Sequence, residues 1–324
     1  MARTRVCGFL LAIFATIVLG LPSTQAAEIL VKCDEGEDLA RAIRSAMKKK
    51  GPSPQGASGF DGRLIVTIRG TCDLASQLRF TSRDFDEVTL RGDAQSGAVL
   101  RTSGVVYGAL LDFRHVDLVG LENLTVEPDT ADVGISFTDV MQARLSFVTL
   151  GPTFGTGIFA QQGSIVSIAN SRIEGDDFAV NSVRSSMNIY NATLESSNHT
   201  LAATDSRIVL GRTQFIGYGG QGLSLLSSNV SAFNATFSGL PRWAFIQDGS
   251  VLSFRCQPRC ALDGDPIVRE RSHLQVIGVD STGSVTLEDF STGSFSGTTF
   301  ARGVLCTRGS DAVGHPGTNC PSAP

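Results

Sequence analysis

An internal repeat of 21 to 24 residues constrains this chain more than any other feature of the sequence. The repeated unit passes from an apolar residue through a polar turn position to a large apolar residue, as in IANSRI at residues 168–173. Six segments share one register, with starts 24, 23, 21, 21 and 22 residues apart: 121–126, 145–150, 168–173, 189–194, 210–215 and 232–237. Such self-similarity predicts a solenoid, in which each repeat packs against its neighbours.

Each repeat holds short strands separated by bends. Residues 165–168 alternate in polarity, a Gly- or Ser-rich bend follows, and residues 178–180 form another short apolar strand. Alternation with a period of two indicates a strand with one buried face. When such strands coil, each lies beside its equivalent one turn on, about 4.8 Å away. We therefore predict an all-β fold, a single-stranded right-handed parallel β-helix, as one domain over residues 27–324.

Both ends of this solenoid are expected to carry caps. Residues 38–50 have helical spacing of their apolar side chains and could cover the open N-terminal end of the core. This helix would lie within an N-terminal cap of about residues 28–60. Residues 281–324 are rich in Gly, Ser and Thr, so we expect an irregular C-terminal cap there.

The first 26 residues have the pattern of a signal peptide. Arg3 and Arg5 form a basic region, residues 9–21 are almost unbroken apolar sequence, and Thr24 and Ala26 supply small residues for cleavage. The apolar run is too short to span a bilayer comfortably. We predict a secreted or periplasmic protein with no membrane span in its mature form.

Cysteine usage agrees with export. Cys7 would leave with the signal peptide, and six cysteines remain. An even number in an exported chain indicates three disulfides, although six cysteines allow fifteen connectivities. Proximity in sequence favours the pairs Cys33–Cys72, Cys256–Cys260 and Cys306–Cys320. A zinc site is the alternative for Cys256 and Cys260, but no His lies beside them.

The net charge of −4 gives no electrostatic reason to expect nucleic acid as a partner. All four lysines precede residue 51, so every later cation is an arginine. Arginine makes planar, two-pronged contacts with carboxylates, which suits a surface that meets acidic sugars. An ordinary exported protein rich in arginine explains the same observation.

Asparagine recurs at one position of the repeat, at Asn170, Asn191 and Asn234, where stacked side chains can bond to each other and to a bent backbone. Five asparagines lie in N-x-[ST] sequons: Asn123, Asn191, Asn198, Asn229 and Asn234. They are either glycan acceptors or a consequence of a repeat that requires Asn at the turn and Thr after it.

Several segments resemble the first rungs of the pectate-lyase-like β-helix superfamily, namely residues 31–36, 66–72, 88–92, 110–113 and 121–126. The likeness covers most of the mature chain. It implies the fold but no single function, because that superfamily includes lyases, hydrolases, epimerases, adhesins and proteins without known activity.

One local match is sharper. Residues 167–180 (SIANSRIEGDDFAV) are similar to the strand, turn and Gly-Asp-Asp segment of polygalacturonases. The resemblance implies that Asp176 and Asp177 could serve inverting hydrolysis. The family's other motifs are incomplete here, since residues 153–156 lack an aspartate, His199 lacks flanking glycines and no lysine follows Lys50. Whether the protein is an enzyme is left open, and a polysaccharide lyase or a glycoside hydrolase-like activity is the expected class if it is one.

The bend at Glu174, Asp176 and Asp177 gathers three carboxylates. A Ca²⁺ ion could bind such oxygens and bridge to an acidic sugar, although no cofactor is required by the sequence. Acidic residues at a turn that are merely solvated are the alternative. His199 follows this bend by one repeat and could carry a proton near neutral pH, or it is a lone exposed histidine at a turn with no functional role.

Aromatic residues and one arginine complete the candidate site. Tyr190 and Phe233 share the position before the turn Asn and should face outward, either as a platform for sugar rings or as aromatic side chains that a loop covers. Trp243, the only Trp, either adds to this platform or packs inside. Arg184 could contact substrate, but it is expected to pair with Asp205 one repeat on. We predict an exported protein that binds, and could process, an acidic polysaccharide; the alternative is a non-catalytic scaffold for protein interaction.

Overall fold

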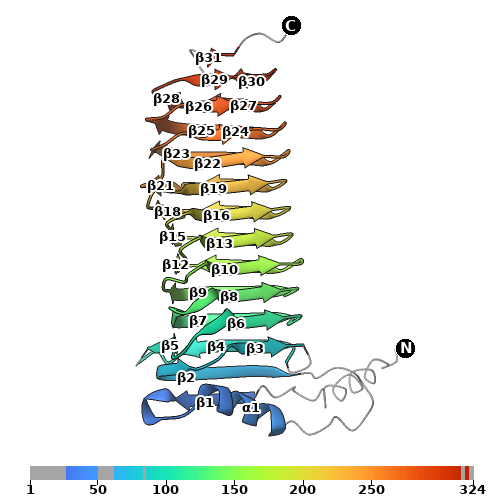
Figure 1. Ribbon diagram of the computed structural model, residues 1–324, viewed down its shortest axis with the longest axis vertical. Coiled ribbons are helices and arrows are strands. Elements are labelled where there is room, and N and C mark those ends of the chain that lie inside the picture. The colour runs from blue at the N-terminus through green and yellow to red at the C-terminus, as the bar shows by residue number, and fades with distance from the viewer. Residues whose placement is uncertain (1–26, 50–61, 83–84, 96, 315–317, 321–324) are drawn as a thin grey trace, which may run out of the picture.

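The computed structural model describes residues 27–49, 62–82, 85–95, 97–314 and 318–320, without the side chains of residues 47–49 and 318–319. Within these residues, two parallel sheets of 19 and 12 strands form a β-solenoid of about 11 turns. Figure 1 shows the turns stacked along one axis, with β1 and α1 at one end of the stack and β31 at the other. The predicted all-β parallel solenoid is confirmed. The predicted signal peptide and residues 50–61 lie outside the described residues.

Each turn contributes two strand positions to the larger sheet, here called its first and second legs. The first leg consists of β1 (Ala27–Lys32), β2 (Arg63–Leu74), β4 (Glu87–Gly92), β7 (Leu118–Glu127), β9 (Gln142–Leu150), β11 (Ile165–Ala169), β14 (Ser186–Tyr190), β17 (Arg207–Gly211), β20 (Asn229–Phe233), β23 (Val251–Leu262), β25 (His273–Ser281), β27 (Thr292–Ser296) and β30 (Asp311–Val313). The longest of these strands continue into the second leg, whose separate strands are β5 (Ala98–Thr102), β12 (Arg172–Glu174), β15 (Thr193–Ser196), β18 (Gln214–Gly217), β21 (Thr236–Ser238) and β28 (Thr299–Phe300).

The smaller sheet forms the third side of each turn. Its strands are β3 (Leu78–Thr81), β6 (Val106–Arg114), β8 (Ala131–Thr138), β10 (Thr156–Gln161), β13 (Phe178–Val183), β16 (His199–Thr204), β19 (Gln221–Leu226), β22 (Arg242–Gln247), β24 (Ile267–Val268), β26 (Val285–Leu287), β29 (Val304–Cys306) and β31 (Thr318–Asn319). The chain therefore turns three corners per repeat: the first between the two legs, the second before the smaller sheet, and the third after it.

The register of the strands follows the sequence repeat. Ile168 is the partner of Ile189, which pairs in turn with Leu210. Upstream, Leu121 pairs with Leu145, and downstream Leu210 pairs with Ala232. All of these side chains are buried. The alignment of apolar positions in the sequence is thus an alignment in space, because equivalent residues fill the same column of the core.

The first corner is one residue wide and has a left-handed backbone. Asn123, Asn170 and Asn191 each have φ of 51°. Asparagine tolerates this region better than other residues with a Cβ because its short polar side chain bonds locally. Asn191 Nδ2 donates to Asn170 Oδ1 at 2.7 Å, as predicted for stacked asparagines. The backbone therefore accounts for asparagine at this corner, whereas the sequons at Asn198 and Asn229 lie elsewhere.

The third corner contains a ladder of buried serines that the sequence analysis did not identify. Ser185 N–H donates to Ser206 Oγ, Ser206 N–H to Ser228 Oγ, and Ser228 N–H to Ser250 Oγ, at 3.0 to 3.2 Å. Each hydroxyl also donates to a backbone carbonyl of its own turn, as Ser228 does to Leu226 at 2.8 Å. These bonds satisfy backbone groups that face the core side of a sharp turn.

Aromatic side chains stack in columns inside the solenoid. Phe113 lies between Phe80 and Phe137, with ring centroids 4.9 and 5.6 Å away. A second cluster centres on Phe237, whose ring lies 4.6 Å from that of Phe215. Offset aromatic pairs at such spacing add to the stabilisation that burial provides.

The N-terminal cap is a helix, as predicted. The structure places α1 at Leu39–Lys49, preceded by a short 3₁₀ turn, η1 (Cys33–Glu35), and beside β1 at the end of the stack (Figure 1). Asp38 Oδ1 accepts a hydrogen bond from Arg41 N–H at 2.9 Å and so caps the helix. Leu39 and Ile43 are buried against the first turn. Over the described ranges, α1 included, no helix is long and apolar enough to cross a membrane.

The expected irregular C-terminal cap is wrong for most of residues 281–324. Strands β26 to β31 continue both sheets to Asn319. Turns here shorten to 19 residues, as the bond from Ser291 N–H to Ser310 Oγ shows, and Phe295 and Phe300 fill the core. The Gly, Ser and Thr content that resembled a loop belongs to tight corners and small strand residues.

The three predicted disulfides are present as Cys33–Cys72, Cys256–Cys260 and Cys306–Cys320. The zinc alternative for Cys256 and Cys260 is therefore wrong, because their sulfurs are bonded to each other. Three disulfides agree with an oxidising compartment.

Candidate functional site

The predicted site residues lie at three different corners of the solenoid. Asp176 and Asp177 form the second corner of one turn, and His199 begins the next strand of the smaller sheet, β16. Tyr190 ends β14 and borders the first corner, as Phe233 does at the end of β20. Arg184 lies at the third corner. The structure therefore brings the carboxylates and the histidine together but separates them from the aromatic platform and from Arg184.

A cavity of about 510 Å³ opens at the second corner. Its lining includes two of the predicted carboxylates, Glu174 and Asp176, together with Glu195, Tyr218 and Phe154. The last three were not predicted. Glu195 could have been found, because it occupies the position of Glu174 one repeat later and pairs with it in the strand register. Tyr218 could not, because it comes from a bend without periodic sequence.

The two glutamates occupy unlike environments. Glu195 is 5% exposed, and its carboxylate contacts the Arg172 guanidinium and accepts a hydrogen bond from Tyr218 OH. Among the described residues, Glu174 forms one ion pair, with Arg172 at 3.8 Å. Burial, and secondly the nearby charge of Glu195, raise the pKa of Glu174 above its usual value. The hydrogen bond to Glu195 likewise raises the pKa of the Tyr218 phenol. Paired carboxyl groups in unlike environments are a common arrangement for proton transfer.

The two aspartates at this corner point to different neighbours. Asp176 accepts a hydrogen bond from Ser197 Oγ on the next turn. Asp177 lies at the start of the smaller sheet, and its carbonyl accepts from His199 N–H at 2.8 Å. In the described part of the chain, no three His, Cys, Asp or Glu side chains gather closely enough to hold a metal ion. The Ca²⁺ site at Glu174, Asp176 and Asp177 stays a prediction.

His199 stacks on a neighbouring aromatic ring. Its imidazole lies 5.3 Å from the Phe178 ring, with 23° between the planes. Its Nδ1 is buried and, among the described residues, has no hydrogen bond partner. Burial lowers the pKa of His199 below its usual 6.5, and the charge of Asp177 opposes this shift only in part. The shift favours the neutral form of the imidazole, which suits a proton acceptor.

Stability should fall in mild acid because of His199. A base whose folded pKa is lowered contributes stability above its unfolded pKa of 6.5, and this contribution is lost as the pH falls toward the lower folded pKa. Between about pH 7.5 and about pH 5.5, the His199→Gln variant should therefore lose less stability than the wild type. Thermal melting of both proteins over this pH range measures the difference. Equal losses in the two proteins would show that His199 protonates as freely in the folded state as in the unfolded one.

The aromatic platform is present but consists of two separated rings. The side chains of Tyr190 and Phe233 are 51% and 40% exposed, in one column of the first leg. Gly211 lies between them, and a Cβ there would meet the Tyr190 ring at 2.4 Å. The Tyr190 ring therefore extends over Gly211, and the Arg212 guanidinium lies 5.9 Å from its centroid.

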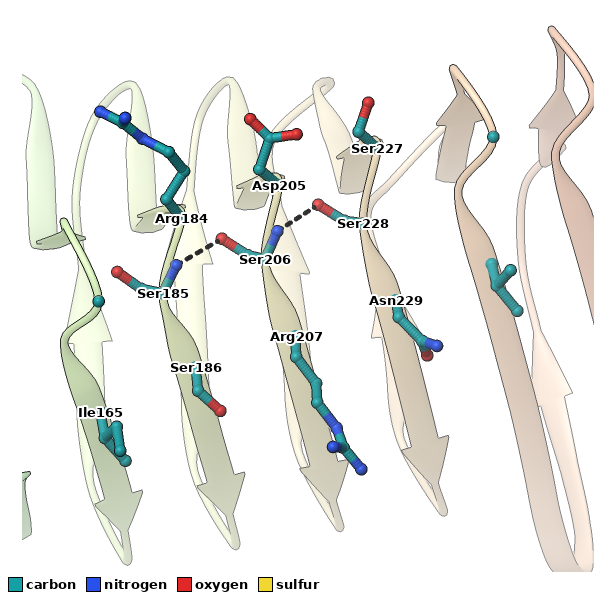
Figure 2. Close-up of a pocket in the computed structure, with 13 residues that line it drawn as sticks. Ile165, Arg184, Ser185, Ser186, Asp205, Ser206, Arg207, Ser227, Ser228 and Asn229 are labelled. Carbon is teal, nitrogen blue, oxygen red and sulfur yellow. Dashed lines mark hydrogen bonds between the residues drawn. The ribbon is translucent and has the colours of Figure 1, made fainter.

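A shallow groove of about 660 Å³ runs along the third corner (Figure 2). Arg184, Asp205 and Ser227 succeed each other along its edge, and Ser186, Arg207 and Asn229 form the parallel column on the first leg. The expected pairing of Arg184 with Asp205 is wrong: in the described residues no ion pair within 4.0 Å joins them. Both residues have left-handed backbone at the corner, with φ of 49° and 50°, and their side chains leave it side by side.

Trp243 does not belong to the platform. Its side chain is fully buried and packs against Phe237 and Phe254, with centroids 5.7 and 5.6 Å away. Its position in β22 faces the core, so it has no surface to present to a sugar ring. The alternative that Trp243 simply packs inside is the correct one.

Comparisons with known proteins add little to this geometry. No protein-family model matches the sequence, and no curated protein matches it. Among solved structures, ORF18 of Geobacillus virus E2 is similar, with a TM-score of 0.47 and 13% sequence identity. The match covers 89% of this chain and 62% of that one, so this chain spans less than two thirds of the length of its structural neighbour. A likeness this distant carries no inference about function.

Proposed function

We propose that this protein is exported and binds an acidic polysaccharide along the outer surface of strands β14, β17, β20 and β23. This surface, here called the arginine face, carries Arg184, Arg207, Arg212, Arg255, Tyr190 and Phe233. The resemblance of the sequence to the pectate-lyase-like superfamily and the three disulfides support an exported carbohydrate-binding protein. The arginines themselves give the main support.

The observation that carries the proposal is a contrast in ion pairing. Of the sixteen described arginines outside this face, ten form salt bridges within 4.0 Å, such as Arg101 with Asp73 and Arg302 with Asp265. The four arginines of the arginine face are exposed, and none of them is joined to a carboxylate by a salt bridge in the described residues. An exposed guanidinium group that no internal carboxylate neutralises can bind an external carboxylate at little cost.

The shape of the surface fits an extended chain. Parallel strands repeat about every 4.8 Å, and Tyr190, Gly211, Phe233 and Arg255 occupy one column across four successive strands, at nearly the spacing of a sugar unit. Between the arginines stand short side chains, such as Ser231 and Ser253, that leave the surface open. The exposed rings of Tyr190 and Phe233 can stack on the apolar faces of sugar rings. A polymer of uronic acids has carboxylates that can pair with the arginines and sugar rings that can stack on the two aromatic side chains.

Polygalacturonate should bind, and its methyl ester should not. The ester keeps the backbone and removes the charge, so the comparison isolates ion pairing. The double variant Arg184→Gln, Arg207→Gln should weaken binding about tenfold, since each exposed charge contact contributes roughly 0.2–1 kcal/mol. The double variant Arg41→Gln, Arg44→Gln, at two exposed arginines on α1, is the control for net charge. Isothermal titration at low and high salt provides the measurement.

Equal binding of the ester, or an unchanged affinity of the double variant, would contradict the proposal. Mass spectrometry of the same samples tests for cleavage: unsaturated fragments would identify a lyase and saturated fragments a hydrolase. Asp177→Asn and His199→Ala would then be tested. If no acidic polysaccharide binds at all, the non-catalytic scaffold becomes the better interpretation.

A further inference from the structure

The second-corner cavity has the opposite charge from the arginine face. Four carboxylates line it, from Asp129, Glu174, Asp176 and Glu195, and none of its described lining residues is Lys, Arg or His. In the described residues, the salt bridges of these carboxylates come from one guanidinium, that of Arg172. A uronic acid would be repelled here, whereas a cation would be attracted.

The cavity also contains a hydroxyl group without a partner. Thr153 is 3% exposed and lines the cavity, and its Oγ1 has no hydrogen bond partner among the described residues. Buried polar groups are nearly always hydrogen-bonded, so the Thr153 hydroxyl group lacks, within the described chain, a partner that a polar group of a ligand in this cavity could supply. This observation is independent of the acidic residues.

Two exposed rings stand at the same cavity. Phe154 and Tyr218 are 69% and 68% exposed, and both line it. Aromatic faces attract cations and also cover the apolar faces of sugar rings. The volume of about 510 Å³ is typical of small-molecule sites and exceeds what one lysine side chain would fill.

We propose that this cavity binds the ammonium group of an amino sugar, with Glu174 and Asp176 as the opposing charges, Thr153 as a hydrogen bond partner, and Phe154 and Tyr218 as the walls. A sugar is favoured over a basic peptide because it uses the rings and the hydroxyl group as well as the charge. Binding would also relieve the mutual repulsion of Glu174 and Glu195. The site is separate from the arginine face, and its existence does not depend on the function proposed for that face.

The test uses a β-linked glucosamine tetramer and its fully N-acetylated form, titrated into the intact protein by calorimetry. The tetramer should bind, and the N-acetylated form should bind at least tenfold more weakly because it has no ammonium group. Glu174→Gln and Phe154→Ala should each lower the affinity of the tetramer about threefold to tenfold. Glu122→Gln removes an exposed carboxylate on β7 and should leave binding unchanged.

Three results would overturn the proposal. Equal affinity for the two tetramers would show that the ammonium group is not recognised. Unchanged affinity of both Glu174→Gln and Phe154→Ala, with melting curves like that of the wild type, would place binding outside the cavity. Tighter binding of an oligolysine peptide than of the tetramer, sensitive to the same two variants, would identify a basic protein segment as the ligand instead.

Discussion

Trp243→Ala should lower the free energy of unfolding by about 3–5 kcal/mol, the range typical of removing a large aromatic side chain from a core. The side chain is fully buried between Phe237 and Phe254. Collapse of the walls is limited because they belong to sheets held in register by neighbouring turns on both sides. Denaturant unfolding followed by circular dichroism measures the loss.

Trp243→Phe is the matched control. The indole Nε1 is buried and has no hydrogen bond partner within the described residues, so phenylalanine removes an unsatisfied donor while keeping most of the apolar contact. We expect a cost below about 1.5 kcal/mol for this change. If both variants were nearly as stable as the wild type, Trp243 would not be packed as the structure places it. Polysaccharide binding by Trp243→Phe should equal that of the wild type.

The turn-to-turn register was predictable from the sequence because it depends on few variables. A side chain in a parallel strand contacts its equivalents above and below, so the position of Ile189 follows once Ile168 and Leu210 are aligned. The asparagines of the first corner were predictable for a similar reason, since a left-handed residue recurs at one position of each turn. Because the same local rule applies in every turn, a sequence pattern that recurs over many turns is rarely a chance match.

The grouping of the site residues was harder to predict, because it depends on the path of the chain around the cross-section. Tyr190 and Glu195 are five residues apart, yet one lies at the first corner and the other at the second-corner cavity. Repeat periodicity places residues along the axis but does not say which side of the solenoid each strand occupies. Tyr218 reaches Glu195 from the second corner of the next turn, where it takes the place that Ser197 holds one turn earlier, so its side chain does not follow the repeat.

The buried position of Trp243 shows a second limit of prediction from the sequence. Its strand contains a buried pair, Trp243 and Ala244, where simple alternation would place one of the two residues outside. Gly222 holds the equivalent position on the preceding turn, and an added Cβ there would meet the Trp243 carbonyl oxygen at 2.5 Å and the Phe237 ring at 2.8 Å. Packing of this kind depends on neighbours one turn away, and period-two patterning does not record it.

Ser206→Ala should cost about 1–3 kcal/mol of stability, although it removes one oxygen atom. The Ser206 hydroxyl accepts from Ser185 N–H at 3.2 Å and can donate to Thr204 O at 2.8 Å. The side chain is buried, so alanine would leave the Ser185 N–H without a partner and without water. Thermal and denaturant unfolding of the purified variant measure the effect.

Ser186→Ala is the neighbouring control, because this side chain lies on the outer face beside the groove (Figure 2) and its loss should change stability by less than about 0.5 kcal/mol. Equal effects of the two substitutions would mean that the serine ladder adds nothing specific.

The double variant Ser206→Ala, Ser228→Ala decides how the ladder works. Since Ser206 N–H donates to Ser228 Oγ at 3.1 Å, the two sites are adjacent steps of one ladder. Additive losses would show that each hydroxyl stabilises its own corner, whereas a coupling above about 0.5 kcal/mol would show that neighbouring turns hold each other in register through these serines.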